Sequence, residues 1–309
     1  MIAYGARRLA IALVVAWLAL TLAFVALRWV PGDAVDATLG RAGLEDAELD
    51  ARRDELGFND PVWRQYLVYL GGLVRGDWGE SLVSGQPVRD ILAQNLGPTA
   101  VLAISALIVA AALGLALGVV ASLARARMVR AGAQAVISLA LSTPVYWTAT
   151  LAIFLFSAQW GLLPGPGGRG LRYLVLPMCV LGFHTAGSIA QVTASSVREA
   201  AGRAFVRTAR AKGLPPVPDV VEHILRVGLL PVIAVVALQL GFLLSGTVIT
   251  EMIFVRRGLG RVLLQAVNNR DYPVIQGVVV LSAVVYSLAN ALADVLSALA
   301  DPRVTGGEG

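Results

Sequence analysis

The chain has 309 residues, of which 57% are hydrophobic and only 15% are charged. A soluble globular domain carries about 25% charged residues, so this composition argues against a soluble enzyme. The formal net charge is +5 without a long basic tract, which argues against a nucleic-acid-binding protein. One cysteine, Cys179, excludes an intrachain disulfide framework, and two histidines, His184 and His223, make a metal cluster improbable, so we expect no metal site.

Uncharged stretches organise the chain. A helix needs about 20 apolar residues to cross a bilayer, and one charged residue at its centre costs roughly 2.5–3.5 kcal/mol, so long runs without charge predict membrane spans. Six runs lack Asp, Glu, Lys and Arg: Leu9–Leu27, Ile91–Ala124, Ala131–Gly168, Tyr173–Val197, Val227–Thr250 and Tyr272–Ala293. We predict an all-α membrane protein with six transmembrane helices. The first run is longer than a signal-peptide core of about 7–15 residues, so we interpret it as a retained anchor.

The loops between these runs predict an orientation and a domain organisation. With the N-terminus inside, the short inner loops carry nine basic residues and the short outer loops six, so the positive-inside rule places both termini in the cytoplasm. The predicted parts are the N-terminus and first helix at 1–30, an exoplasmic loop at 31–98, a five-helix core at 99–304 and a tail at 305–309. The core includes a cytoplasmic loop at 195–228.

The long first loop has the pattern of folded helices. Leu44–Leu56 indicates a charged helix, and Asp60 followed by Pro61 predicts the N-cap and first residue of a second helix. Gly76–Glu80 predicts a turn, and Pro87 predicts the start of a short amphipathic helix that suits the membrane interface. The apolar face of that helix would contain Val88, Ile91, Leu92 and Leu96. The loop is either a cap over the helix bundle or a ligand-contacting surface.

The segment after the fourth run combines helical periodicity with basic residues. The periodicity continues from Arg198 to Lys212, and Gly213 predicts the C-terminal stop. One stripe of this helix would contain Glu199, Arg203, Arg207 and Arg210. Glu199 and Arg203 form an i,i+4 pair in the favourable order. Two interpretations remain open: a solvated positive-inside loop, or a rigid basic helix that docks into a groove on a soluble partner.

Few polar residues stand out within or beside the spans. His184 lies inside the fourth run, where an ionisable residue is a functional candidate, although a hydrogen bond to a neighbouring helix also explains it. Glu251 ends the fifth run and either faces the mouth of a translocation path or forms a cap or salt bridge. Gly114 and Gly118 form a GxxxG pattern, which indicates close helix packing either within the chain or with a partner.

Several stretches of the sequence resemble one family of membrane proteins. The most specific is the octet Arg207–Leu214, followed eighteen residues after Gly213 by Pro231. Further matching stretches are Val30–Asp33, Gly76–Leu82, Gly258–Arg261, Asn269–Pro273 and Asp301–Arg303. Together they resemble the ABC importer permeases of the binding-protein-dependent peptide/nickel (dipeptide and oligopeptide) family, in the subunit with the longer first exoplasmic loop. The prolines at 215, 216 and 218 depart from the family pattern.

The resemblance implies a type I ABC importer permease fold in the cell inner membrane. It implies a second homologous permease that completes the path, two cytoplasmic ATPase subunits that hold ATP and Mg²⁺, and an extracytoplasmic solute-binding protein. The implied ATPase-docking residues are Glu199, Ala200, Arg203, Arg207, Thr208, Ala209, Arg210, Lys212, Gly213 and Leu214. The chain has no GxxxxGK[ST] phosphate loop, so it is not expected to be the ATPase itself. We expect that it is not an enzyme and binds no cofactor of its own. The solute stays open among peptides, nickel chelates and glutathione-like compounds.

Two other function classes share this composition. An ion-coupled secondary transporter normally needs a carboxylate or histidine relay near mid-membrane, and only His184 qualifies. An intramembrane protease would need an HExxH pair, paired mid-membrane aspartates or GxSxG, and the spans contain none of these. We therefore predict a permease subunit that forms half of a translocation path.

Overall fold

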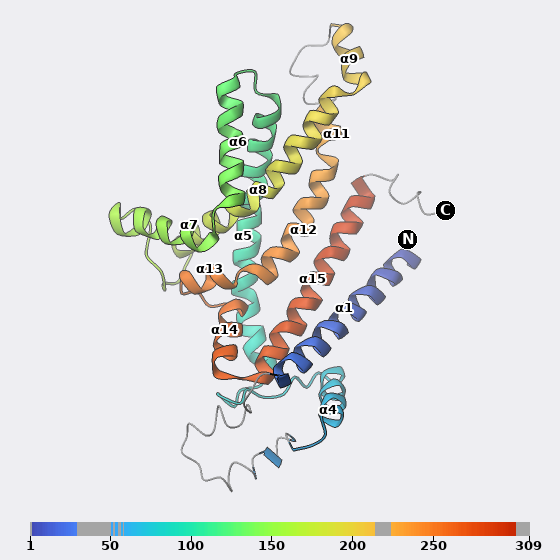
Figure 1. The fold of residues 1–309 in the computed structure, drawn as a ribbon, viewed down its shortest axis with the longest axis vertical. Coiled ribbons are helices and arrows are strands. Elements are labelled where there is room, and N and C mark those ends of the chain that lie inside the picture. The colour runs from blue at the N-terminus through green and yellow to red at the C-terminus, as the bar shows by residue number, and fades with distance from the viewer. Residues whose placement is uncertain are drawn as a thin grey trace. The chain divides into compact units, whose positions relative to one another are not determined.

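The computed structural model describes residues 2–29, 51, 53–54, 57, 59–213 and 224–300. These residues form helices and no strand beyond a single antiparallel bridge between Glu80 and Pro87 (Figure 1). The elements in chain order are α1 (Ile2–Trp29), α4 (Val62–Val74), α5 (Val88–Leu123), α6 (Arg127–Ser142), α7 (Val145–Ala152), the π-helix η2 (Ile153–Gln159), α8 (Arg172–Gly202), α9 (Ala204–Ala211), α11 (Arg226–Gly228), α12 (Leu230–Gly246), α13 (Val248–Ile253), α14 (Leu259–Asn269) and α15 (Tyr272–Ala300).

The predicted membrane spans are present, with one difference. Five helical segments are long and apolar enough to cross a bilayer: Ala10–Trp29, Val88–Leu123, Arg172–Gly202, Arg226–Leu244 and Tyr272–Leu292. The third predicted span, Ala131–Gly168, is broken into α6 and the α7–η2 segment, which are bent by 107° relative to each other. The all-α membrane class is confirmed, and the described residues contain six spans if the bent pair counts as one.

The break in the third predicted span has a local cause. Pro144 lacks an amide hydrogen, and its ring disfavours the helical conformation in the residue before it. Thr143 accordingly adopts an extended conformation with φ −83° and ψ 138°, which ends α6, and α7 begins directly after the proline. Figure 1 shows α7 leaving the direction of α6 sideways. A run without charges therefore predicted the apolar length correctly but not its continuity.

The chain separates into two compact units. The first unit contains Met1–Thr99 and Arg257–Ser287, and the second contains Ala100–Arg256 and Leu288–Gly309. The core of the first unit joins residues of α5, α14 and α15, among them Val88, Leu92 and Leu259. In the second unit α8 is central, because about half of its residues are buried against α5, α6, α7 and α12.

Helix boundaries in the first unit correct the predictions from sequence. Pro61, not Asp60, is the residue before α4, and its carbonyl accepts the amide hydrogens of Arg64 and Gln65. The predicted short interfacial helix after Pro87 is wrong, since it is the start of the 36-residue helix α5, which continues through Pro98. Its apolar face packs inside the protein core rather than against lipid. The predicted helix Leu44–Leu56 lies largely outside the described residues.

The GxxxG pattern is explained by packing within the chain. A β-carbon on Gly114 would lie 2.7 Å from the side chain of Ile189, and one on Gly118 would lie even closer to that of Thr193. Both neighbours belong to α8, so the two glycines let the backbones of α5 and α8 approach closely. Gly182 on α8 makes the reciprocal contact, because its β-carbon would lie 2.8 Å from Val109 on α5.

Candidate functional site

The basic segment after α8 is a separate short helix. The predicted continuous helix from Arg198 to Lys212 is wrong at one residue: α8 ends at Gly202, and Arg203 is extended, with φ −67° and ψ 152°. α9 then begins at Ala204, and the carbonyl of Arg203 accepts the first amide hydrogens, from Val206 and Arg207. Gly202 lowers the helical propensity at this point, which favours the break.

Burial of Val206 accounts for the change of direction at Arg203. The Val206 side chain is fully buried in a cluster with Val197, Ala200 and Ile224, which attaches α9 to the end of α8. A continuous helix would displace Val206 from this position. The predicted pair between Glu199 and Arg203 is present, with 3.0 Å between Oε1 and Nη2, but it now joins the end of α8 to the residue between the helices.

The predicted docking residues fall into three groups. Exposed residues are Glu199, Arg203, Arg207, Thr208, Lys212 and Gly213, whereas Ala200 is buried. Ala209 and Arg210 belong to α9 but their side chains are not described, and Leu214 lies outside the described residues. Gly213 has φ +82°, the left-handed conformation that favours glycine after a helix, so the predicted helix stop is confirmed. The segment therefore presents a short helix with exposed cations on an apolar anchor.

His184 forms hydrogen bonds to both helices of the broken third span. Its Nδ1 lies 3.0 Å from the carbonyl oxygen of Ala140 on α6, and its Nε2 lies 2.6 Å from Oγ1 of Thr148 on α7. A carbonyl oxygen only accepts, so Nδ1 donates to Ala140. Nε2 shares a hydrogen bond with the Thr148 hydroxyl, which also lies 3.0 Å from the carbonyl oxygen of Val145. Ala140 lies in the last turn of α6, where carbonyls have no partner within the helix. His184 thus caps α6 and holds α7 at the same time.

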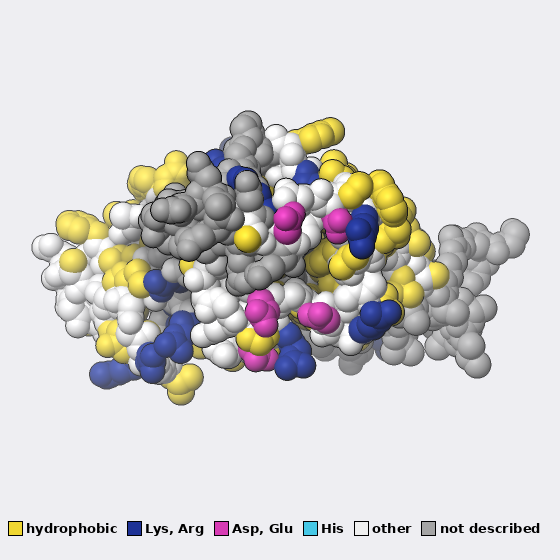
Figure 2. Space-filling view, turned by 90° about the horizontal axis from the view of Figure 1, so that it is seen from below, with side chains coloured by type: hydrophobic (Ala, Val, Ile, Leu, Met, Phe, Trp, Pro, Cys, Tyr) yellow, Lys and Arg dark blue, Asp and Glu magenta, His cyan; other side chains and the backbone are white. Residues whose placement is uncertain are grey.

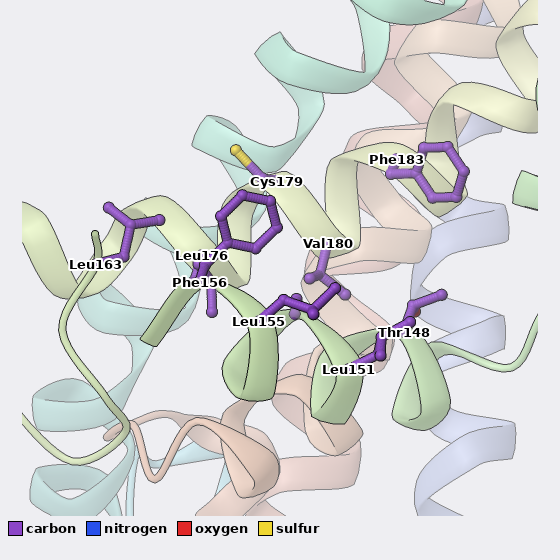
Figure 3. A pocket seen from close by; sticks show the side chains of 10 residues that line it. Thr148, Leu151, Leu155, Phe156, Leu163, Leu176, Cys179, Val180 and Phe183 are labelled. Carbon is purple, nitrogen blue, oxygen red and sulfur yellow. The ribbon is translucent and has the colours of Figure 1, made fainter. Parts of the chain in front are cut away.

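An apolar cavity of about 330 Å³ lies between α7, η2 and α8, next to this histidine contact. Figure 3 shows its lining, in which Thr148, Leu151 and Leu155 extend from one side and Val180 and Phe183 come from α8. Apart from the hydroxyl of Thr148, which bonds to His184, the side chains of this lining are apolar or sulfur-containing. A peptide backbone would find no free hydrogen-bonding side chain there, so this cavity does not suit recognition of a polar solute.

Glu251 is enclosed by its own chain. Its side chain is fully buried, and Oε1 accepts a hydrogen bond of 3.0 Å from Oγ1 of the equally buried Thr247. Its backbone carbonyl accepts the amide hydrogen of Arg256 at 2.8 Å. Burial lowers the pKa of the Arg256 guanidinium, and the nearby Glu251 carboxylate opposes that shift. Of the two roles left open for Glu251, these contacts favour the structural one.

A buried polar contact in the first unit joins two of the matching stretches. Asp271 is 4% exposed and accepts hydrogen bonds from the Ser81 hydroxyl, at 2.5 Å, and from the Leu82 amide, at 3.2 Å. Ser81 Oγ in turn accepts the amide hydrogens of Val83 and Ser84. This Ser81–Asp271 contact fixes the turn after α4 against the start of α15. Sequence reasoning singled out both stretches but did not predict that they meet.

Charged side chains of both signs also lie in the first unit. Arg64 pairs with Asp60 at 3.0 Å, and Arg89 lies 3.3 Å from Asp90. Figure 2, seen from below, shows basic and acidic side chains interspersed with apolar ones. A surface of mixed sign does not steer a solute of one particular charge.

Comparison with known proteins identifies the family. Residues 114–306 match the family described as "Binding-protein-dependent transport system inner membrane component", and residues 1–103 match its N-terminal counterpart. The chain is 34% identical to the di/tripeptide transport system permease protein DppB of Pseudomonas aeruginosa (strain UCBPP-PA14), over 98% of this chain and 99% of that protein. The chain belongs to this family. It is a multi-pass permease subunit of an ABC importer.

Other relatives agree with this assignment. The permease is 35% identical to the dipeptide transport system permease protein DppB of Escherichia coli (strain K12), over 92% of this chain and 93% of that protein. It is 34% identical to the glutathione transport system permease protein GsiC of the same strain, over 92% of each chain. A solved structure titled "Crystal structure of an amino acid ABC transporter with histidines" matches with a TM-score of 0.52, 15% identity, and coverage of 70% of this chain and 94% of that one. This last match supports the fold alone.

Replacing His184 tests its role at the break in the third span. In His184→Ala, the Ala140 carbonyl and the Thr148 hydroxyl both lose a partner, so we expect a loss of about 1–3 kcal/mol in the free energy of unfolding. The measurement is the unfolding midpoint of the reconstituted permease. Thr150→Ala is the matched control, because the Thr150 hydroxyl donates to the Tyr146 carbonyl on its own helix. Equal midpoints for the two variants would contradict the assigned role.

Replacing Ser81 tests the Ser81–Asp271 contact. Ser81→Ala leaves one oxygen of a buried carboxylate without its hydroxyl donor and removes the acceptor for the Val83 and Ser84 amides. We expect local opening to become easier by about 1–3 kcal/mol, observed as faster amide hydrogen exchange at residues 82–84. Ser84→Ala is the control, since it keeps the contact with Asp271. The contact is unimportant if both variants exchange at the wild-type rate.

Proposed function

We propose that this permease forms half of a translocation path for di- or oligopeptides and related peptide-like compounds. The observation that supports the solute class is the agreement among its relatives, whose names refer to di/tripeptide, dipeptide and glutathione transport. These solutes share an amide backbone and differ in side chains.

We propose that α9 and its flanking residues dock onto a cytoplasmic ATPase subunit. Docking by a short helix requires exposed contact groups on a rigid support. The cations of Arg207 and Lys212 are exposed, and Val206 attaches the helix to the end of α8 through a fully buried contact. The full proposed set is Glu199, Ala200, Arg203, Arg207, Thr208, Ala209, Arg210, Lys212, Gly213 and Leu214.

Docking onto an ATPase implies the remaining partners of an ABC importer. The proposed assembly contains a second homologous permease, two ATPase subunits that hold ATP and Mg²⁺, and an extracytoplasmic solute-binding protein. This chain then performs no catalysis and needs no cofactor of its own. The excess of basic residues in the loop that contains α9 supports a cytoplasmic position for that loop and for both termini.

We keep His184 and Glu251 as proposed residues of the path, with a restricted role. Both side chains are hydrogen-bonded within this chain, to Thr148 and Ala140 in one case and to Thr247 in the other. We infer that they shape the wall of the path and do not bind the solute directly. Neither side chain then contacts the solute, which suits passage of peptides with varied side chains.

Reconstitution tests the proposed solute class. The permease, its partner permease, the ATPases and the binding protein are reconstituted in proteoliposomes, and uptake of a labelled dipeptide is measured with and without ATP. We expect ATP-dependent uptake that unlabelled di- and tripeptides reduce by competition and free amino acids do not. Uptake driven by a proton or sodium gradient without ATP would instead support the ion-coupled alternative.

Variants of α9 test the proposed docking. Arg207→Glu reverses an exposed charge, and Gly213→Val places a β-branched residue at φ +82°, so each variant changes the docking surface or its end. We expect solute-stimulated ATP hydrolysis and uptake to fall roughly five- to 150-fold, the range of a coupling free energy of about 1–3 kcal/mol, while membrane insertion is unchanged.

Gly132→Ala is the control for these variants. It alters an exposed glycine of α6, outside the docking segment, that has no positive φ and nothing within 4 Å of an added β-carbon. It should therefore retain both activities. Normal coupling in Arg207→Glu and Gly213→Val, with the ATPases still bound in copurification, would contradict docking through α9.

A further inference from the structure

Helix α4 is attached to α1 by aromatic and polar contacts. The ring of Phe24 lies 5.1 Å from that of Tyr66 and 6.3 Å from that of Tyr69. The hydroxyls of Thr21 and Tyr66 are 2.6 Å apart. Figure 1 shows α4 beside the end of α1 at which that helix stops. These contacts use one face of α4, the face formed by Tyr66, Tyr69 and the turn between them.

A second apolar stripe of α4 lies beside the face that contacts α1. At about 100° per residue, positions i, i+4, i+7 and i+11 share one side of a helix, and these positions hold Trp63, Leu67, Leu70 and Val74. The side is rotated by about 100° from the one that contacts Phe24. Trp63 is 66% exposed, Leu67 57% and Val74 87%. Arg64 is the only charged residue of α4 and lies off this stripe.

The contacts with α1 define the depth of α4 relative to the membrane. The apolar span of α1 ends at Trp29. With a rise of about 1.5 Å per residue, Phe24 lies about 7.5 Å and Thr21 about 12 Å before that end. Since α4 contacts both residues, it lies beside the last turns of the span. Interfacial helices typically sit about 5–10 Å deep at the boundary between headgroups and acyl chains.

We propose that α4 is an interfacial anchor whose stripe of Trp63, Leu67, Leu70 and Val74 contacts lipid at the boundary between acyl chains and headgroups. Three observations support lipid as the occupant. Helix α1, which α4 contacts, also exposes apolar side chains, among them Leu18 at 46% and Leu22 at 68%. Trp63, Tyr66 and Tyr69 give α4 the aromatic composition of an interfacial belt. Arg64, paired with Asp60, lies off the stripe, where it can meet the headgroups or water.

As an interfacial anchor, α4 gives the first loop a further role. The loop is neither only a cap nor only a ligand-contacting surface, because α4 fixes one part of it at a set depth. The turn at Gly76–Glu80 follows α4 directly, so its height above the bilayer is set by the same contact. The proposed orientation places this lipid contact in the outer leaflet. The depth of α4 does not depend on that orientation.

Spin labelling of the assembled importer tests this inference. Cys179 is the only cysteine, so a Cys179→Ser background allows single cysteines at chosen positions. Nitroxide labels are placed in Trp63→Cys, Leu67→Cys and Val74→Cys, and the importer is reconstituted in nanodiscs. Accessibility to oxygen, which concentrates in lipid, is compared with accessibility to a water-soluble nickel chelate. Controls are Leu22→Cys on the lipid-facing side of α1, Ser84→Cys in the exposed turn, and Arg64→Cys on α4 itself.

The inference predicts an ordered set of oxygen-to-nickel ratios. The three stripe positions should give ratios several-fold above those at Arg64 and Ser84, and between these and the ratio at Leu22. Ratios on the stripe equal to those at Ser84 would show that it faces water and would overturn the inference. Low accessibility to both reagents would show that the stripe is covered by another subunit, which would overturn it as well. Neither result would affect the proposed solute or docking role.

Discussion

In a bilayer a helix can be interrupted only where other groups take over the hydrogen bonds that the interruption releases, and this constraint governs the permease. Pro144 ends α6 in the middle of an uncharged run, which leaves the last carbonyls of that helix without partners. Thr143 satisfies one of these carbonyls, that of Leu139, because its amide and its hydroxyl both donate to it. His184, from a different helix, donates to Ala140. The one histidine within the spans is therefore placed where the chain needs a donor.

The same reasoning separates what the sequence could predict from what it could not. The absence of charge predicted the apolar spans, because the cost of burying a charge in lipid is large and does not depend on tertiary contacts. Whether a helix continues through an apolar run was harder to predict. Pro98 and Pro144 look alike in sequence, yet α5 continues through the first and α6 ends before the second. At Pro144 the Ala140 carbonyl has its donor in His184, a residue of another helix, and the local sequence does not place that donor there.

The basic segment illustrates the same limit at shorter range. Charge, periodicity and Gly213 were sufficient to predict a helix of the right composition with the right end. They did not predict the interruption at Arg203. The interruption is favoured by the free energy gained when Val206 is buried against residues outside α9. Likewise, Ser81 and Asp271 are 190 positions apart, and nothing local to either residue indicates that they form a hydrogen bond. Local patterns predicted elements, and contacts between distant residues set their exact geometry.

The glycine contacts between α5 and α8 restrict how these two helices can move. Ile189 and Thr193 sit against Gly114 and Gly118, and Val109 sits against Gly182. Each bulky side chain faces a position where only a hydrogen atom fits, so a small slide of one helix along the other would bring side chains into collision. The next arrangement of comparable fit lies a full helical turn away, about 5.4 Å. Gradual slippage is thus disfavoured, and we expect α5 and α8 to travel together as one body whenever the transporter changes state.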